Sequence, residues 1–387
     1  MFEMLLGGKA PISAGSIKKA MAGGADLLAL SESGKLYGIC STYLSGTGTA
    51  TTTWTKILDD VEDFWAGFRQ CLAKMKDGRW LFWGTNSIRI SGITSGGVIT
   101  TPTDVSAAFS SLNGQTIKSL VLSSQTIAVV LTDGRYAILG ANGNGGCATG
   151  NTTAVTTMTI KTDYTNVAKV ALAPVEDTTY LLLSDGTIIG CGQSLYGQLN
   201  VTGQSSITSW RTLVTTAGAL KAVDLIATYS GWFNLREDPT YNYIYAQGRQ
   251  FDGSLGTGQT AATNVSSQTL VSKRAVGAGP LEFYVGTYSF RFRDPATGEM
   301  FFSGTGSAAF GFSTGAAFPA GTKYVPTKMP SNAMWGPLFA TVNGYTAVYL
   351  NIEGNLFGAG SPGSSGLLPG YTSAQTTFVP LDTGAVV

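Results

Sequence analysis

A pattern that recurs seven times constrains the fold of this chain more than any other feature. Most copies have an apolar strand, a tight turn that ends in Gly, a second apolar strand, and a Gly six residues after the first; the first copy has Cys40 at that last position, with Gly38 nearby. The third and fourth copies show it most fully, at 126–140 (TIAVVLTDGRYAILG) and 180–192 (YLLLSDGTIIGCG). The residues that end the seven turns are Gly34, Gly78, Gly134, Gly186, Asn242, Gly298 and Gly354. Such regular self-similarity predicts an array of like structural units.

The residues in these turns suit a two-residue β-hairpin. Asp-Gly or Ser-Gly ends most of them, and the fifth copy has Asn242 where the others have Gly. A type I′ turn needs positive φ at both central residues, and Asn is the residue that best replaces Gly there. We therefore expect seven hairpins, with Asn242 in a left-handed conformation.

The spacing of the hairpins selects a propeller. Successive turns lie 44 to 56 residues apart, which leaves room for about four short strands in each unit. The sequence predicts an all-β fold, a seven-bladed β-propeller with four-stranded blades. The seven units account for almost the whole chain, so residues 1–387 are expected to form a single domain, with 1–15 as an N-terminal arm. We also expect the two chain ends, including 376–381 (TTFVPL), to close one shared blade, which would leave no exposed sheet edge.

A glycine-rich loop follows each second strand, as in Ser184–Leu199 (SDGTIIGCGQSLYGQL). This run resembles the repeat of the regulator of chromosome condensation family, and the resemblance covers about residues 20 to 380. It implies a seven-bladed propeller with four-stranded blades. Family repeats usually carry a His before the hairpin, and this chain has no His. The nucleotide-exchange activity of some members does not follow, because function depends on sites rather than on folds.

Charge and hydropathy exclude several classes of partner. Only 12% of the residues are charged and the net charge is +1, whereas nucleic-acid recognition needs a basic surface. The chain has no apolar run of 18 residues, so no membrane insertion is expected. The first residues lack the features of a signal peptide, so secretion by that route is not expected.

The sequence does not predict a catalytic, cofactor or metal site. Without His, the Ser-His-Asp and Cys-His arrangements and most zinc sites are excluded. No phosphate-binding loop is present, and the four Cys are too far apart in sequence for a paired motif. The acidic cluster at Asp59, Asp60, Glu62 and Asp63 is interpreted as a solvated face, with calcium binding as the alternative. A pair of carboxylates that meet across the channel and cleave a glycan remains the one enzymatic alternative.

The aromatic residues divide into two groups. Those on the strand after each turn are expected to form core between blades: Trp80, Trp83, Tyr243, Tyr245, Phe301 and Phe302. Those in the glycine-rich loops are candidates for surface contacts: Tyr43, Tyr196, Phe251, Phe310 and Tyr371.

Three functions are compatible with these features. The first is a non-enzymatic structural or host-recognition component of a virion, such as a bacteriophage tail, bound to other virion proteins or to a host glycan or protein. The second is a cytoplasmic protein-interaction propeller that acts on a GTPase. The third is a propeller that binds or cleaves polysaccharide.

Overall fold

The computed structural model places each predicted hairpin within a four-stranded antiparallel sheet. It describes residues 17–22, 26–93, 96–215, 220–229, 231–250, 254–259, 263–277, 281–285, 289–294, 296–304, 325–328, 338–340, 346–350, 356–360 and 375–380. The predicted N-terminal arm (1–15) and Gly354 lie outside these residues.

Within the described part of the chain the strands form seven sheets, and each sheet uses four strands that are consecutive in sequence. We number these sheets as blades in chain order. Blades one to four contain β1 (Ile17–Ala22), β2 (Leu27–Ser31), β3 (Leu36–Ile39), β4 (Thr55–Leu58); β5 (Val61–Gly67), β6 (Gln70–Met75), β7 (Trp80–Thr85), β8 (Val98–Asp104); β9 (Ile117–Leu122), β10 (Thr126–Leu131), β11 (Tyr136–Gly140), β12 (Val155–Lys161); and β13 (Val167–Leu172), β14 (Thr178–Leu183), β15 (Ile188–Tyr196), β16 (Thr202–Val214). Blades five to seven contain β17 (Lys221–Ala227), β18 (Gly231–Glu237), β19 (Tyr241–Gln250), β20 (Thr263–Ala275); β21 (Glu282–Val285), β22 (Ser289–Arg293), β23 (Met300–Gly304), β24 (Thr327–Lys328); and β25 (Leu338–Ala340), β26 (Thr346–Leu350), β27 (Leu356–Gly360), β28 (Gln375–Pro380). A 3₁₀ helix, η1 (Ser106–Leu112), follows β8.

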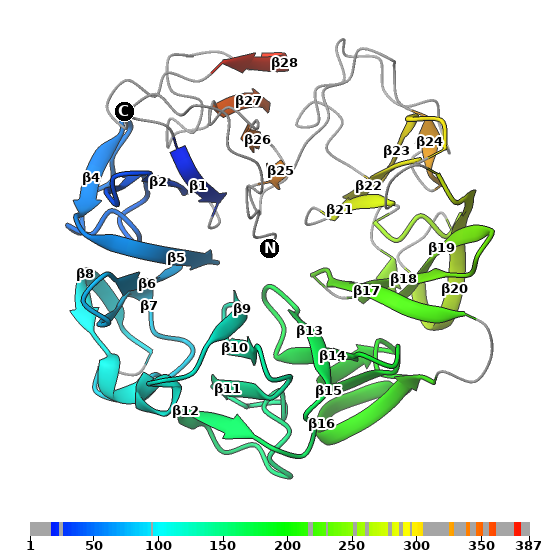
Figure 1. Cartoon of the computed structure of the whole chain (residues 1–387), viewed down its shortest axis with the longest axis horizontal. Helices are drawn as coiled ribbons and strands as arrows, with labels where there is room; N and C mark the ends of the chain where they lie inside the picture. Colours follow the sequence, from blue (N-terminus) through cyan, green and yellow to red (C-terminus); the bar gives the residue numbers. More distant parts are fainter. Residues whose placement is uncertain are drawn as a thin grey trace.

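The blades are arranged around an axis, and the first strand of each lies nearest to it (Figure 1). The predicted propeller class is confirmed. Both faces of a blade pack against neighbouring blades, so its middle strands are apolar throughout rather than alternating. In β10, for example, all six residues are buried, whereas the outer strand β12 exposes three of its seven.

The hydrophobic core lies between blades. One cluster joins Leu28 and Leu30 of the first blade to Phe64 and Trp83 of the second, and similar clusters join later neighbours. Of the six aromatics that we expected in the core, Trp80, Trp83, Phe301 and Phe302 are buried, while Tyr243 and Tyr245 are half-buried.

The hairpin turns differ from the predicted type. The Met75 N–H donates to the Arg79 carbonyl and the Gly78 N–H donates to the Met75 carbonyl, each at 2.9 Å. These bonds enclose a three-residue loop in which only Gly78 has a positive φ, of 91°. This geometry is a type I turn followed by a bulge, because Asp77 is not left-handed. The turns that end at Gly34, Gly134 and Gly186 have the same two bonds.

The expectation for Asn242 is wrong. Asn242 lies within β19, opposite Glu237, and is not among the described residues with positive φ. The fifth turn is shorter: the Asp238 N–H donates to the Tyr241 carbonyl at 3.0 Å, and only Pro239 and Thr240 lie between them. In it the Asp238 carboxylate accepts the N–H groups of Thr240 and Tyr241, each at 2.7 Å. The side-chain cap replaces the left-handed residue, so Asn242 is free to join the strand.

The expectation of a shared blade is also wrong. The first sheet uses only β1 to β4, and the last uses only β25 to β28, which includes the segment 376–381 in part. Each end of the chain supplies enough strands for a complete blade, so no exchange is needed. The ring is closed by packing of β1 against β25 and β26 (Figure 1).

Candidate functional site

Two kinds of turn give the ring two different faces. One face carries the turn between the second and third strands of each blade, and this turn contacts the connection into the next blade. The Val61 N–H donates to the Gly34 carbonyl and the Val167 N–H to the Gly134 carbonyl, each at 2.8 Å. We call this the hairpin face. The other face carries the turn between the first and second strands of each blade and the long loop between its third and fourth strands, and we call it the loop face.

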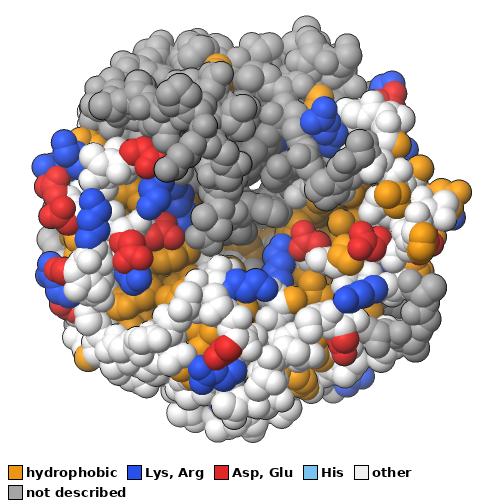
Figure 2. All heavy atoms as spheres, viewed as in Figure 1, with side chains coloured by type: hydrophobic (Ala, Val, Ile, Leu, Met, Phe, Trp, Pro, Cys, Tyr) orange, Lys and Arg blue, Asp and Glu red, His pale blue; other side chains and the backbone are white. Residues whose placement is uncertain are grey.

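Most of the described charged residues lie toward the hairpin face. They occupy its turns, the connections into the inner strands and the strand ends that pair beside them. Figure 2 shows this face, with Lys and Arg intermixed with Asp and Glu around the ring. Exposed examples are Glu32, Lys35, Asp60, Glu62, Asp77, Arg79, Asp104, Asp133, Asp163, Asp185, Lys221, Glu237 and Lys273. Among the described residues, the loop face has few charged groups, chiefly Arg69, Arg89, Glu176 and Arg249.

Ion pairs join neighbouring blades close to the axis. The inner strands carry a bulge at the same place, and Lys19, Asp63, Lys169 and Asp224 follow it in their respective strands. Lys19 bonds to Asp63 at 2.8 Å, and its ammonium lies 4.8 Å from the ring centre of Trp65. Lys169 bonds to Asp224. Asp63 and Asp224 thus each hold two neighbouring blades together.

The hairpin face of the fifth blade presents a row of aromatic and charged side chains. Lys273 lies 3.8 Å from the ring centre of Tyr241 and 5.4 Å from that of Tyr243, and the Tyr243 hydroxyl donates to Asp238 at 2.7 Å. We call the set Asp238, Tyr241, Tyr243, Lys273 and Arg274 the rim. Exposed or half-buried Tyr and Arg are the residue types that dominate the energetics of protein interfaces.

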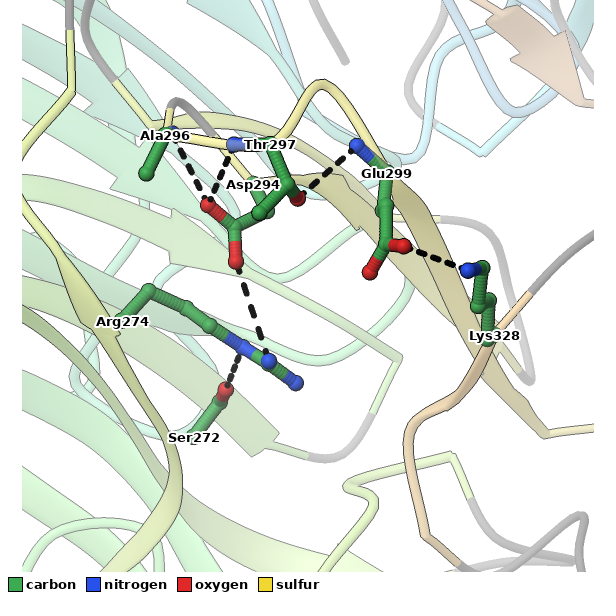
Figure 3. Close-up of polar contacts among 7 residues, drawn as sticks. All are labelled: Ser272, Arg274, Asp294, Ala296, Thr297, Glu299 and Lys328. Carbon is green, nitrogen blue, oxygen red and sulfur yellow. Dashed lines mark hydrogen bonds and ion pairs between the residues drawn. The ribbon is translucent and has the colours of Figure 1, made fainter. Parts of the chain in front are cut away.

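Arg274 connects this rim to the sixth blade (Figure 3). Its guanidinium lies 3.7 Å from Asp294 and 3.9 Å from the ring centre of Phe301, and its Nε donates to Ser272. Asp294 also accepts the Ala296 and Thr297 N–H groups, at 2.9 and 3.3 Å. The rim is therefore held on two blades at once.

The loops of the loop face are organised by buried polar side chains that the sequence analysis missed. Asn86 accepts the N–H of Ile90, Asn142 accepts that of Cys147, and Ser194 accepts that of Leu199. Each apolar partner is buried between blades. The polar residue stands two positions after the second repeated Gly of its unit (Gly84, Gly140, Gly192), so alignment of the repeats on that Gly could have found it.

Two buried carboxylates lie beneath the loop face. Asp177 accepts the N–H groups of Asn144 and Gly146, at 2.7 and 3.4 Å, and the Thr126 hydroxyl at 3.3 Å. Burial raises the pKa of Asp177 above its ordinary value, although these bonds oppose the shift. Asp26 is fully buried; it accepts the Ser41 N–H, and its Oδ2 has no hydrogen-bond partner among the described residues.

The buried carboxyl group of Asp26 should make the stability of the folded protein depend on pH. Burial raises its pKa from 3.8 to about 6, so the folded state favours the protonated form. The stability that this group contributes is present below pH 4 and is lost as the pH rises through 6. We expect Asp26→Asn to raise the free energy of unfolding by about 1–2 kcal/mol at pH 7 and to change it little at pH 4. Urea denaturation at both pH values measures this, and an equal effect at the two would contradict it.

A cleft of about 670 Å³ opens on the loop face over the second, third and fourth blades. It is lined by Phe68, Asn86, Ser87, Arg89, Gly96, Ser124, Gln125, Ala141, Gly143 and Val175. These residues come from the turns that follow β5, β9 and β13 and from the loops that follow β7 and β11. Neutral polar groups and backbone dominate the lining, and Arg89 is its one charged residue.

Of the loop aromatics predicted as surface contacts, Tyr43 and Tyr196 are half-buried on the loop face. Each pairs with an arginine of the next blade: the Arg69 guanidinium lies 4.7 Å from the ring centre of Tyr43, and Arg249 lies 4.8 Å from that of Tyr196 and donates to its hydroxyl. They therefore contribute to packing between blades as well as to the surface. Phe251, Phe310 and Tyr371 lie outside the described residues.

The structure also bears on the cysteines and on the acidic cluster. All four Cys are buried free thiols. Around the acidic cluster, Asp59 bonds to Lys56 and Glu62 to Lys74, and the described residues contain no group of three or more potential metal ligands.

Among the described residues no helix has the length and apolarity needed to span a membrane.

Comparisons with known proteins identify the fold. No protein-family model matches the sequence, and no curated protein matches it. The chain is similar to yeast RCC1 (Prp20) in its complex with Kap60, with 14% identity, 97% of this chain and 85% of that chain covered, and a TM-score of 0.72. A structure of Prp20p from Saccharomyces cerevisiae, described together with its binding to Gsp1p and histones, is 13% identical, with 97% of this chain and 88% of that chain covered and a TM-score of 0.70. Human WBSCR16 is 13% identical, with 86% of this chain and 85% of that chain covered and a TM-score of 0.63. At these identities the likeness shows an RCC1-like β-propeller fold.

Proposed function

We propose that this chain is a non-enzymatic protein-interaction propeller that binds its partner through the hairpin face, with the rim as the centre of the contact. The observation that carries the proposal is the unequal distribution of charge. A chain with only 12% charged residues gathers most of those described on one face, where Lys273 contacts Tyr241 and Tyr243 and Arg274 contacts Phe301. Complementary charge steers and orients a protein partner, and aromatic residues supply the affinity.

The similar structures support this class of function. Prp20 is seen with Kap60, and the second Prp20p structure is described with binding to Gsp1p and histones, so propellers of this shape serve as platforms for proteins. We accordingly favour a protein partner, with a GTPase as the first candidate and the cytoplasm as the location.

Affinity capture tests the proposal. The full chain would be immobilised and used to capture proteins from cells of its source, in parallel with Tyr241→Ala/Lys273→Ser and with Arg89→Gln, which alters the opposite face. We expect the rim variant to lose the captured partner by about tenfold or more, because truncation of a central Tyr costs about 2 kcal/mol or more. The Arg89→Gln variant should retain it.

The identity of the partner discriminates further. Enrichment of a nucleotide-free GTPase would support an exchange regulator. Equal capture by all three proteins would contradict the assignment to the rim.

A second candidate is a virion component, such as part of a bacteriophage tail, with other virion proteins or a host-surface glycan as partners. The observation that favours it is the low charge of the loop face, which suits fixed assembly or contact with neutral, hydroxyl-rich molecules. Mass spectrometry of purified particles tests this candidate, and absence of the chain from particles would exclude it.

A further inference from the structure

The loop-face cleft has a feature that neither protein binding on the hairpin face nor the fold requires. Arg89 lies in the loop after β7 with φ of 66°, a left-handed conformation that is uncommon for a residue other than Gly. Its side chain is exposed and lines the cleft, and it forms no ion pair or side-chain hydrogen bond with the described residues. Strained backbone that holds a side chain at a cleft is often associated with a functional role.

The charge of the cleft is positive. No acidic residue lines it. Glu176 follows the lining residue Val175, and its carboxylate accepts the side-chain amide of Gln198 at 3.0 Å. Arg69 adds a second positive charge beside the cleft, because its guanidinium lies 5.1 Å from the ring centre of Phe68. A ligand group that binds beside Arg89 is therefore an anion.

The other lining groups suit a sugar. Phe68 contributes an aromatic ring, half-buried at the cleft wall. Ser124 donates its hydroxyl to the Val175 carbonyl at 3.0 Å, so its oxygen remains able to accept from a ligand hydroxyl. Ser87 and Gln125 add further polar groups, whereas an apolar pocket for a peptide side chain would need more than one large hydrophobic residue. The volume is within the range of sites for small ligands.

We propose that this cleft binds an acidic saccharide, with Arg89 as the ligand of a sugar carboxylate and Phe68 as the surface against which the ring packs. The planar guanidinium matches a carboxylate with two parallel hydrogen bonds, and Lys does not reproduce that geometry. The site lies on the face opposite the rim, so it is independent of the proposed protein partner.

Calorimetric titration of the full chain tests this proposal. Three acidic probes would be used: a hyaluronan tetrasaccharide, a trimer of galacturonate and a dimer of sialic acid. Neutral chitotetraose and an acetylated peptide with two glutamates serve as comparison ligands. We expect at least one acidic saccharide to bind, and to bind tenfold or more tightly than either comparison ligand.

Variants locate the site. Arg89→Gln should weaken binding of that saccharide by about tenfold or more, because a hydrogen-bonded charged partner is lost. Arg89→Lys should recover only part of the affinity, and Phe68→Leu should also reduce it. Arg79→Gln, an exposed arginine of the hairpin face, is the matched control and should bind as the wild type does.

Several outcomes would overturn the proposal. Absence of binding by all three acidic saccharides would refute it. Equal binding of chitotetraose would show that Arg89 does not select a carboxylate. Equal binding of the glutamate peptide would show a carboxylate site that is not specific for sugars.

Discussion

Alanine at Gly134 is expected to lower the free energy of unfolding by about 2–5 kcal/mol, whereas alanine at Gly78 should lower it by about 1–2 kcal/mol. The two glycines end equivalent turns in neighbouring blades and have similar φ, of 84° and 91°. Both substitutions therefore carry the same cost of a left-handed residue with a side chain. The surroundings differ: a Cβ at Gly134 would lie 2.3 Å from the backbone oxygen of Thr165, and a Cβ at Gly78 would meet nothing within 4 Å.

The larger effect at Gly134 arises from contact between blades. The Gly134 carbonyl accepts the N–H of Val167 at 2.8 Å, so this turn cannot move away from Thr165 without loss of the bond into the next blade. Urea denaturation of the two variants and the wild type measures the difference. Equal losses of unfolding free energy at the two positions would show that the turn at Gly134 relaxes freely and that the contact with Thr165 does not contribute to stability.

Asp177→Ala is expected to lower the free energy of unfolding by about 3 kcal/mol or more. The substitution leaves the N–H groups of Asn144 and Gly146 and the Thr126 hydroxyl without their acceptor in a buried place. Each buried polar group that loses its partner costs about 1–3 kcal/mol. Because the carboxylate joins the third blade to the fourth, the loss should also loosen the loop of residues 142–148.

Asp177→Asn is the matched control. Asn keeps an oxygen that can accept from these donors, and it has no charge. Since burial raises the pKa of Asp177, the folded protein disfavours the charge, and we expect the Asn variant to remain within about 1 kcal/mol of the wild type at pH 7. Denaturation together with amide exchange at Asn144 and Gly146 measures both effects. A loss with Asn as large as that with Ala would argue that the charge itself is required.

The aromatic residues show which structural features a local sequence pattern predicts and which it does not. The strand position of Trp83 predicts a buried residue, and the structure confirms it. Its indole N–H donates to the Leu44 carbonyl of the preceding blade at 3.0 Å, and this partner could not be predicted, because it is 39 residues away. Tyr243 also follows its turn, but it lies five positions before Gly248, whereas Trp83 lies one position before Gly84. It is therefore at the turn end of its strand, where it is half-buried at the rim.

The sequence by itself determined the all-β class and the hairpins, because strand propensity and the glycine needed at a bulged turn are local properties of a few residues. Only the tertiary structure decided that Asn242 joins a strand, that each chain end forms its own blade, and that charge gathers on the hairpin face. It also brought Arg89 and Phe68 to one cleft and placed Asp177 under a loop of the preceding blade. These features depend on how neighbouring blades pack, and that packing joins residues about fifty positions apart that no local pattern relates.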